Sequence, residues 1–508
     1  MTLTMSGHDY HFELENICRL FLPQEKIQTL KEGAELPSAD GIVADTRLER
    51  GERSSRLVCR LRLDSFDESK TAVVSNDHPE YRDECELELA TLLYHLFVKL
   101  FGFAQEWGIV TGVRPVKLLR RLVRDEGEEE ALRYFRERLL VNESKTALCR
   151  QTLAIEDQIL ALSRPDSFSL YISIPFCPTR CDYCSFVSQT VERSAKLMPA
   201  YVDNLVKEIA FTGELARQLG LRLETVYFGG GTPTALTTEQ LSRLLKAVEQ
   251  SFDLSHLREY TVEAGRPDTV TREKLQAIRA AGVSRVSINP QTLRDEVLQT
   301  IGRKHTVEQF YDAFSLARQA GCDHINTDLI AGLPGDTLSG FQDTLSGILA
   351  LDPESITIHT LSMKRASNLV IQHREDYTRQ EEAVQMVALS AEQLPATGYR
   401  PYYLYRQSRM VGNQENVGWA KPGHEGLYNV YIMDETHTIL GCGAGAVSKL
   451  KQPAGDYLER IFNYKFPYEY NDRLSEMLKR KERVRTFYEE MAAQKDLGRG
   501  GDQLPCDA

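Results

Sequence analysis

A sixfold alternation of strand and helix signals, between residues 168 and 359, constrains the fold of this chain most strongly. Short apolar segments recur there with helical stretches between them: Leu170–Ile174, Thr225–Phe228, Tyr260–Val262, Arg285–Ile288, Ile325–Ile330 and Ser355–His359. Capping boxes at Thr237 and Thr306 open two of the helices, and Gly282 and Gly321 follow two helical stretches where a C-cap would lie. Repeated strand–helix–strand units predict a parallel sheet with right-handed crossovers. Six units predict a partial α/β barrel, open where two further units are missing.

Three cysteines follow the first of these strands, at the end where parallel barrels gather their chemistry. Cys177, Cys181 and Cys184 have the spacing C-x3-C-x2-C. Three thiolates on one loop can hold three corners of an iron–sulfur cube and leave one iron open to another ligand. A closed zinc site needs four ligands, and no second C-x2-C or H-x3-H follows nearby. A redox C-x-x-C pair would not need Cys177. The spacing therefore predicts a cluster that acts on a bound molecule.

Length and composition indicate a globular protein of two or three domains. The chain has 508 residues and a net charge of −12, so a global positive field for nucleic acid is not expected. No apolar segment approaches the ~18 residues of a membrane span, and the first residues carry no secretory signal. Ten cysteines are too few for a disulfide scaffold and agree with a reducing cytoplasm.

The domain organisation is predicted from changes in pattern along the chain. Residues 1–163 read as a small α+β domain followed by helices, since Leu57, Cys59 and Leu61 alternate with polar residues. Residues 164–380 form the barrel and residues 381–495 a mixed C-terminal module. The glycine-rich segment 496–508 is expected to be a disordered tail.

The cysteine loop resembles that of the radical S-adenosylmethionine (SAM) superfamily. Its flanks, Tyr171 to Phe176 and Tyr183, are similar to the oxygen-independent coproporphyrinogen III oxidase branch, which also contains haem chaperones. The likeness covers roughly residues 165 to 450. The long N-terminal region, with Trp107, Gly108, Thr111, Gly112, Arg114 and Pro115, resembles the HemZ type. This resemblance implies a six-stranded partial barrel, a [4Fe–4S] cluster and SAM as cofactors.

The resemblance also implies which residues bind SAM. They stand at the predicted strand ends: Tyr171, Tyr183, Gly230, Gly231, Thr232, Glu263, Gln291, Arg303 and Asp328. Each has a plainer interpretation, namely a turn for the glycines and Gln291, a solvated acid for Glu263, a helix-end charge for Arg303 and a paired strand residue for Asp328. The family's Glu-x-x-Pro has one extra residue here, between Glu263 and Pro267, which puts the loop after Glu263 in doubt.

The activity that the resemblance implies is oxidative decarboxylation of coproporphyrinogen III to protoporphyrinogen IX. It requires a tetrapyrrole substrate and an electron donor of the flavodoxin or ferredoxin type. Two alternatives stay open: a haem chaperone that keeps the cluster and SAM, and another radical reaction on a tetrapyrrole. Ser173 and Phe186 replace a histidine and a cysteine of one oxidase type, which favours the chaperones.

One basic helix face lies outside the barrel. Lys117, Arg120, Arg121 and Arg124 recur at helical spacing after Pro115. Such a face could attract a tetracarboxylate, although a solvated face is the more common meaning of a charge run.

Overall fold

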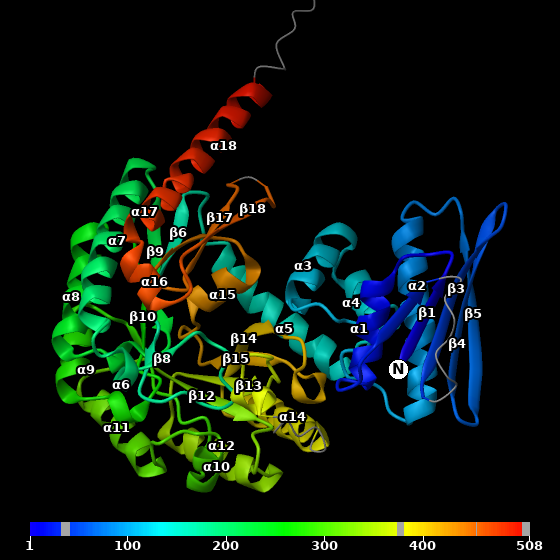
Figure 1. The fold of residues 1–508 in the computed structure, drawn as a ribbon, viewed down its shortest axis with the longest axis horizontal. Helices are drawn as coiled ribbons and strands as arrows, with labels where there is room; N and C mark the ends of the chain where they lie inside the picture. Colours follow the sequence, from blue (N-terminus) through cyan, green and yellow to red (C-terminus); the bar gives the residue numbers. More distant parts are fainter. Residues whose placement is uncertain (32–40, 373–379, 454, 500–508) are drawn as a thin grey trace, which may run out of the picture. The chain divides into compact units, whose positions relative to one another are not determined.

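The computed structural model describes residues 1–31, 41–372, 380–453 and 455–499 (Figure 1). Contacts divide the chain into two units, one of Met1–Arg150 with Arg406–Gln414 and one of Gln151–Tyr405 with Glu415–Ala508. A division by contacts does not show which segments fold independently. The predicted domain bounds therefore stay a prediction. Most of the predicted tail, residues 500–508, lies outside the described residues. No helix among the described residues has the length and apolar character needed to cross a membrane.

The described part of the first unit contains a five-stranded sheet in the order β2-β1-β3-β4-β5. Its strands are β1 Thr2–Ser6, β2 Gln28–Lys31, β3 Val43–Arg50, β4 Ser54–Leu63 and β5 Phe66–Ser75. β1 is parallel to β2 and β3, whereas β3, β4 and β5 form antiparallel pairs. Leu57, Cys59 and Leu61 of β4 are fully buried, which confirms the alternation predicted there.

Helices of the first unit cover this sheet and extend from it. They are α1 His11–Phe21, α2 Tyr81–Phe101, α3 Pro115–Glu126 and α4 Glu128–Glu137, and α5 Glu143–Leu160 runs into the second unit. α2 packs on β4 and β5, and α1 packs on α2. The predicted helix after Pro115 is confirmed, whereas the role of its basic face stays a prediction.

The two ends of the Trp107–Pro115 signature are buried in the first unit. Trp107 is buried, and the Arg406 guanidinium lies 5.2 Å from the centre of its ring. The Arg406 backbone N–H donates a 2.8 Å hydrogen bond to Val113 O. These contacts explain why Arg406–Gln414 groups with the first unit. Residues 109–112, Arg114 and Pro115, with Glu13 and Glu86, line a pocket of about 270 Å³.

The second unit contains the predicted barrel strands in the predicted order. They are β6 Ser167–Ile174, β9 Arg222–Gly230, β10 Glu259–Glu263, β11 Arg285–Ser287, β12 Ile325–Ala331 and β13 Ser355–Thr360. Each pairs in parallel with the next. Buried apolar side chains such as Leu170, Val226 and Val262 alternate along these strands with buried polar ones such as Ser169, Thr225 and Thr261. Since alternate residues point to opposite faces, both faces of the sheet are covered and one of them carries many polar groups.

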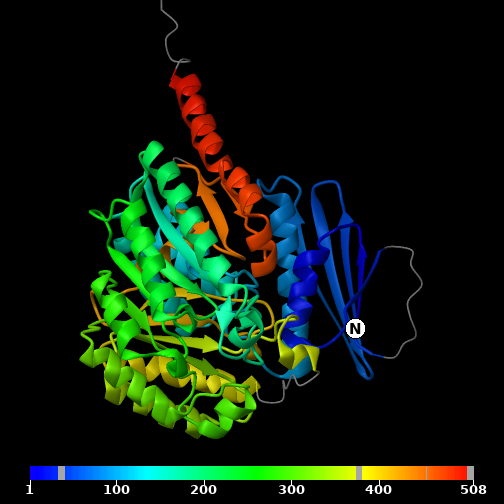
Figure 2. The same cartoon turned by 60° about the vertical axis from the view of Figure 1, so that its left-hand side comes forward.

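Helices connect consecutive strands on the outside of this curved sheet (Figures 1 and 2). They are α7 Met198–Gln218, α8 Thr238–Ser251, α9 Arg272–Ala280, α10 Asp295–Thr300, α11 Val307–Gln319 and α12 Leu338–Leu351. The predicted capping boxes are present at Thr237 with Gln240 and at Thr306 with Gln309. Gly282 and Gly321 have left-handed backbones just past α9 and α11, as a C-cap requires.

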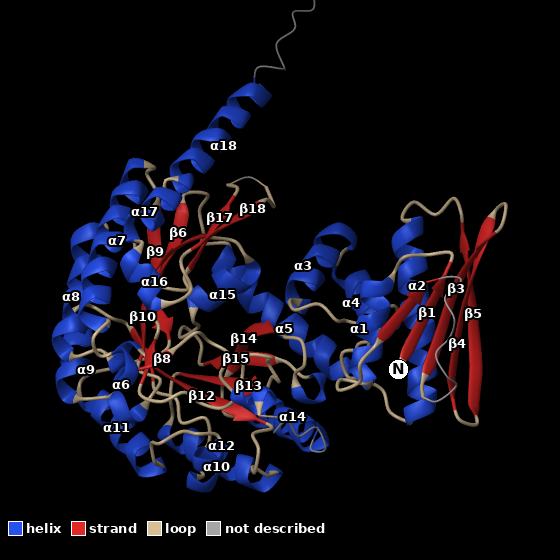
Figure 3. Cartoon of the chain, viewed as in Figure 1, coloured by secondary structure: helices blue, strands red, loops and turns tan. Residues whose placement is uncertain are grey.

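The segment after residue 396 extends the sheet at both edges (Figure 3). After α14 Gln380–Ala396, the strands β14 Arg400–Tyr405 and β15 Asn416–Ala420 add to the β13 edge, where β15 is antiparallel to β13. After α15 Leu427–Asp434, β16 Thr438–Cys442 pairs in parallel with β6, and β17 Val447–Lys451 and β18 Leu458–Phe462 follow. These five strands and the six barrel strands thus form one eleven-stranded sheet.

A buried charge pair fastens the last helices, α16 Pro467–Asp472, α17 Leu474–Lys481 and α18 Arg483–Arg499, to the barrel. Lys481 Nζ lies 2.7 Å from Glu208 Oε1 of α7 and donates to Gly441 O at 2.7 Å. Glu208 also accepts hydrogen bonds from Tyr470 (2.6 Å) and Asn463 (2.8 Å). Although burial opposes both charges, the pairing keeps the pKa of Lys481 above its usual value and that of Glu208 below. Both side chains therefore stay ionised.

Candidate functional site

The cysteine loop leaves the carboxyl end of β6. Cys177 ends the short strand β7 Phe176–Cys177, which pairs with β8 Gln189–Thr190, and α6 Val191–Ser194 follows. The Cys184 backbone N–H donates to Cys181 O at 3.1 Å, which closes the C-x-x-C turn. Thr232 Oγ1 lies 3.5 Å from Cys177 Sγ, and Arg266 Nη1 lies 3.9 Å from Cys181 Sγ. The sulfurs therefore stand among hydrogen-bond donors, which suit thiolate ligands.

The cysteine loop is not arranged as a site for a single ion. Among the described residues, no group of three or more His, Cys, Asp or Glu side chains could hold a metal ion. This is expected for cluster ligands, because each cysteine of an iron–sulfur cube binds a different iron. Burial raises the pKa of Cys184 to about 11, so iron must displace the proton of this thiol when its sulfur binds the metal.

The glycine run after β9 packs directly against the approach to the cysteine loop. The Gly231 N–H donates to Ile174 O and the Thr232 N–H to Phe176 O, both at 2.8 Å. A Cβ at Gly231 would lie 2.7 Å from Phe176 O, and Gly230 has φ +105°. Larger residues are therefore excluded at both positions, and a simple turn is not the sole reason for the glycines.

Gln291 and Arg303 bring polar atoms without partners to the ends of β10 and β11. Gln291 has a left-handed backbone with φ +68°, fixed by its N–H to Asp328 O at 3.0 Å. Arg303 donates to Asn289 O at 2.8 Å and Gly265 O at 2.9 Å. Gln291 Oε1 and Arg303 Nε are buried and have no hydrogen-bond partner among the described residues. Strain and orphaned polar atoms together are typical of ligand sites.

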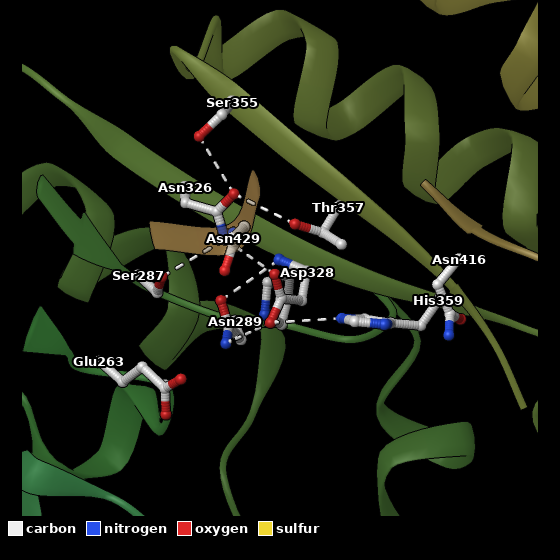
Figure 4. A network of polar contacts seen from close by, with 12 residues as sticks. Glu263, Ser287, Asn289, Asn326, Asp328, Ser355, Thr357, His359, Asn416 and Asn429 are labelled. Atoms are coloured by element: carbon white, nitrogen blue, oxygen red, sulfur yellow. Dashed lines mark hydrogen bonds and ion pairs between the residues drawn. The ribbon is translucent and has the colours of Figure 1, made fainter. Parts of the chain in front are cut away.

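Asp328 lies at the centre of a polar network on β11, β12 and β13 (Figure 4). Asn289 and Asn326 donate to its two carboxylate oxygens at 2.7 and 2.8 Å, and His359 Nε2 lies 3.7 Å from Oδ2. Burial alone would raise the pKa of Asp328, but His359 and the hydrogen bond from Asn326 hold it below its usual value. Sequence reasoning missed Asn289 and His359, although both stand at predicted strand ends.

Glu263 belongs to a second group, set among tyrosine rings. Tyr227 O–H donates to Glu263 Oε1 at 2.5 Å, and burial raises the pKa of Glu263 to about 7. The Tyr227 ring stacks on Tyr428 with centroids 4.5 Å apart, and Tyr171 stacks on both. Tyr428 comes from α15, some 200 residues away in sequence, so no local signal could have placed it here.

The loop between Glu263 and Pro267, which has one residue more than the family pattern, contacts the cysteine loop. Arg266 donates to the backbone oxygen and hydroxyl of Thr179 in the cysteine loop, at 3.2 and 3.1 Å, and pairs with Asp268 at 3.1 Å. Pro267 then opens a short 3₁₀ turn, Pro267–Thr269. The loop whose conformation was in doubt thus supports the cysteine loop.

The predicted residues therefore meet at one end of the parallel sheet. The contacts above join the cysteine loop, the glycine run, Arg303 and Asp328. Tyr183 is buried beside Arg303 and Cys181. The orphaned acceptor Gln291 Oε1 and donor Arg303 Nε fit a polar ligand such as one with an amino acid end and a ribose. The assignment of each residue to cluster or SAM stays a prediction.

Comparison with known proteins decides the family. Residues 171–347 match the model of the radical SAM superfamily. The chain is 37% identical over 93% of its length to the oxygen-independent coproporphyrinogen-III oxidase-like protein HemZ of Bacillus subtilis, of which it covers 95%. The chain belongs to the radical SAM superfamily and, within it, to the HemZ-like proteins. As a radical SAM protein it uses a [4Fe–4S] cluster and SAM, as predicted.

Two further comparisons concern parts of this radical SAM protein. The haem chaperone HemW of Bacillus subtilis is 31% identical over 59% of the chain and 77% of the relative. The solved structure of the coproporphyrinogen III oxidase HemN from Escherichia coli matches with a TM-score of 0.50 and 23% identity, over 63% of this chain and 72% of that one. The latter likeness supports the predicted radical SAM fold.

Proposed function

We propose that the protein decarboxylates coproporphyrinogen III to protoporphyrinogen IX. The observation that carries this proposal is the extent of the likeness to HemZ, which is named as a coproporphyrinogen-III oxidase-like protein and matches 93% of the chain. The haem chaperone HemW matches 59% of the chain and the oxygen-independent coproporphyrinogen III oxidase of Paracoccus denitrificans 61%, so both leave out a large part of the chain that HemZ shares. A radical SAM protein concerned with porphyrins is thus established, whereas the reaction is the proposed part, as are the electron donor and a cytoplasmic location.

The described residues suit this chemistry in defined ways. When bound, the cluster and SAM supply the radical that takes a hydrogen atom from a propionate side chain. Loss of CO2 and transfer of one electron to an external acceptor would then leave a vinyl group. Gly230 and Gly231 let the segment after β9 pack closely against Ile174 and Phe176, which keeps these predicted SAM residues beside the cysteine loop. Asp328, held ionised by His359 and Asn326, is an acceptor for hydroxyl groups.

The rings of Tyr171, Tyr227 and Tyr428 fill the interior beside Glu263. Their packing excludes water from the space next to the predicted SAM residues, which protects a radical from side reactions. A haem chaperone needs no such reaction on a propionate, although it would bind the same cofactors. Ser173 supports neither function, because its hydroxyl donates to Ala444 O at 2.8 Å and is used within the fold.

One anaerobic incubation tests the proposal. Reconstituted protein, SAM, a reductant and coproporphyrinogen III are mixed, and the products are identified by mass spectrometry. We expect a product that has lost two CO2 and four hydrogens, with matching SAM consumption. The Cys184→Ala variant is the negative control and Cys322→Ala the matched positive control. Haem binding without this product would reject decarboxylation and favour the chaperone.

A further inference from the structure

The loop after β13 is fastened onto the cysteine loop. Arg180 Nη2 donates to Ala366 O at 2.6 Å, and the Leu369 N–H donates to Asp182 O at 3.0 Å. Asn368, at the start of the short helix α13 Asn368–Ile371, donates to the Asp182 carboxylate at 3.1 Å. The loop also continues β13, the strand that carries His359. Residues of this loop therefore border the cofactor end of the barrel.

Lys364 lies in the middle of this loop and carries a charge that nothing in the described structure compensates. Its side chain is half-buried, and its ammonium makes no hydrogen bond or ion pair with any described residue of the chain. Burial lowers its pKa, and no neighbouring carboxylate opposes that effect. A partly desolvated ammonium without a partner is costly, and a bound anion would offset that cost.

Two other cations at this end of the barrel, Arg303 and Arg266, are already used within the fold. Arg303 donates hydrogen bonds to the carbonyl oxygens of Asn289 and Gly265. Arg266 forms an ion pair with Asp268 and donates a hydrogen bond to Thr179. Arg365, next to Lys364, is exposed and projects from the same loop. Among these four cations, Lys364 thus combines partial burial with a free ammonium, which is the combination that an anion site requires.

We propose that Lys364 binds a propionate carboxylate of the tetrapyrrole and so orients it toward the cofactors. This inference rests on the proposed function for the identity of the ligand, a molecule with four carboxylates. The ammonium on a flexible stem suits a carboxylate that must be released after each turnover. Lys364 acts here as a substrate-binding residue of the barrel, in a loop that the sequence motifs did not include.

The test compares Lys364→Met with Arg365→Met, which removes the same charge one residue away. Binding of coproporphyrin III, the stable oxidised form of the substrate, is titrated by fluorescence on anaerobic holoprotein. We expect Lys364→Met to weaken binding about tenfold or more, Arg365→Met to stay within about twofold, and Lys364→Arg to retain most of the affinity. The uncharged tetramethyl ester should bind wild type and Lys364→Met equally.

Two measurements distinguish a propionate contact of Lys364 from a SAM contact and from a long-range charge effect. Iron content and SAM affinity should be unchanged in Lys364→Met; a selective loss of SAM affinity would assign the ammonium to the SAM carboxylate and overturn the inference. Equal losses in Lys364→Met and Arg365→Met would also overturn it, because they indicate only a long-range charge effect. If wild type binds coproporphyrin III through Lys364 but yields no vinyl product, the proposed function fails while the inference stands.

Discussion

Two regions of the second unit bury polar and charged groups, but they differ in whether those groups have partners. At the outer helices, Lys481 and Glu208 are fully enclosed, and their charged groups are hydrogen-bonded to each other and to neighbours. At the carboxyl ends of the strands, Gln291 Oε1 and Arg303 Nε are equally buried but have no partner among the described residues. His305, also buried there, has none at either ring nitrogen.

This difference separates a structural network from a site. A complete network stabilises the fold and gains nothing from a ligand, whereas orphaned groups cost free energy until a ligand satisfies them. We therefore expect substitutions in the two regions to have opposite signatures. Changes at the outer network should lower stability, and changes at the strand ends should lower cofactor binding with little effect on stability.

The largest effect is expected at the cysteine loop. Cys181→Ala should reduce iron from about four atoms per chain to almost none after anaerobic reconstitution, since two thiolates cannot anchor the cube. Iron analysis and the visible absorption spectrum measure this directly. Cys322→Ala, at a buried cysteine outside the loop, should keep its iron. Full iron in Cys181→Ala would refute the assignment of the site.

The next effect should appear at the complete network. Lys481→Met leaves the Glu208 carboxylate buried without its cation, which should lower the free energy of unfolding by about 3–5 kcal/mol in chemical denaturation. Lys479→Met, at an exposed lysine of the same helix, is the matched control and should change stability by less than about 0.5 kcal/mol. Similar stability of the two variants would show that the network is not structural.

A smaller and opposite effect is expected at Gln291. Gln291→Gly removes the orphaned amide and suits the left-handed backbone, so relief of strain should offset the added flexibility. SAM affinity should fall about tenfold, which corresponds to about 1.4 kcal/mol for one hydrogen bond. Equilibrium binding of SAM and thermal unfolding measure the two quantities. A large loss of stability with normal SAM affinity would reverse the interpretation of this region.

The smallest effect concerns pH. The pKa of Glu263 is about 7 in the folded protein, above that of an unfolded glutamate, so its stabilising contribution is present at low pH and is lost as pH rises toward 7. Glu263→Gln keeps the acceptor for Tyr227 but cannot ionise. Its melting temperature, relative to wild type and without SAM, should therefore rise between pH 5 and pH 8. Glu273→Gln, at an exposed glutamate, should show no such trend.

Local patterns predicted the framework of the second unit well. The strands from Leu170 to His359 and the capping boxes at Thr237 and Thr306 rest on neighbouring residues, and all are confirmed. The end of the barrel that gathers the motifs followed from strand direction alone. Here the sequence contains the information within a few residues of each feature.

Features that depend on distant residues could not be predicted in this way. Tyr428 meets Tyr227, and Lys481 meets Glu208, only because β15 and β16 return to opposite edges of the sheet. Neither residue stands in a recognisable motif. Lys364 was missed for a different reason, because its isolation from any carboxylate is a property of the folded surroundings and leaves no mark on the sequence.

The position of β16 beside β6 also affects synthesis of the chain. β6 is the first strand of the barrel to leave the ribosome, but one of its edges has no neighbour until β16 is made. At about 5–20 residues per second, the roughly 260 residues between Ile174 and Thr438 take about 13–50 s to add. During that time the open edge of β6 can pair with a strand of another nascent chain. Translation speed across this segment should therefore affect the yield of correctly folded protein.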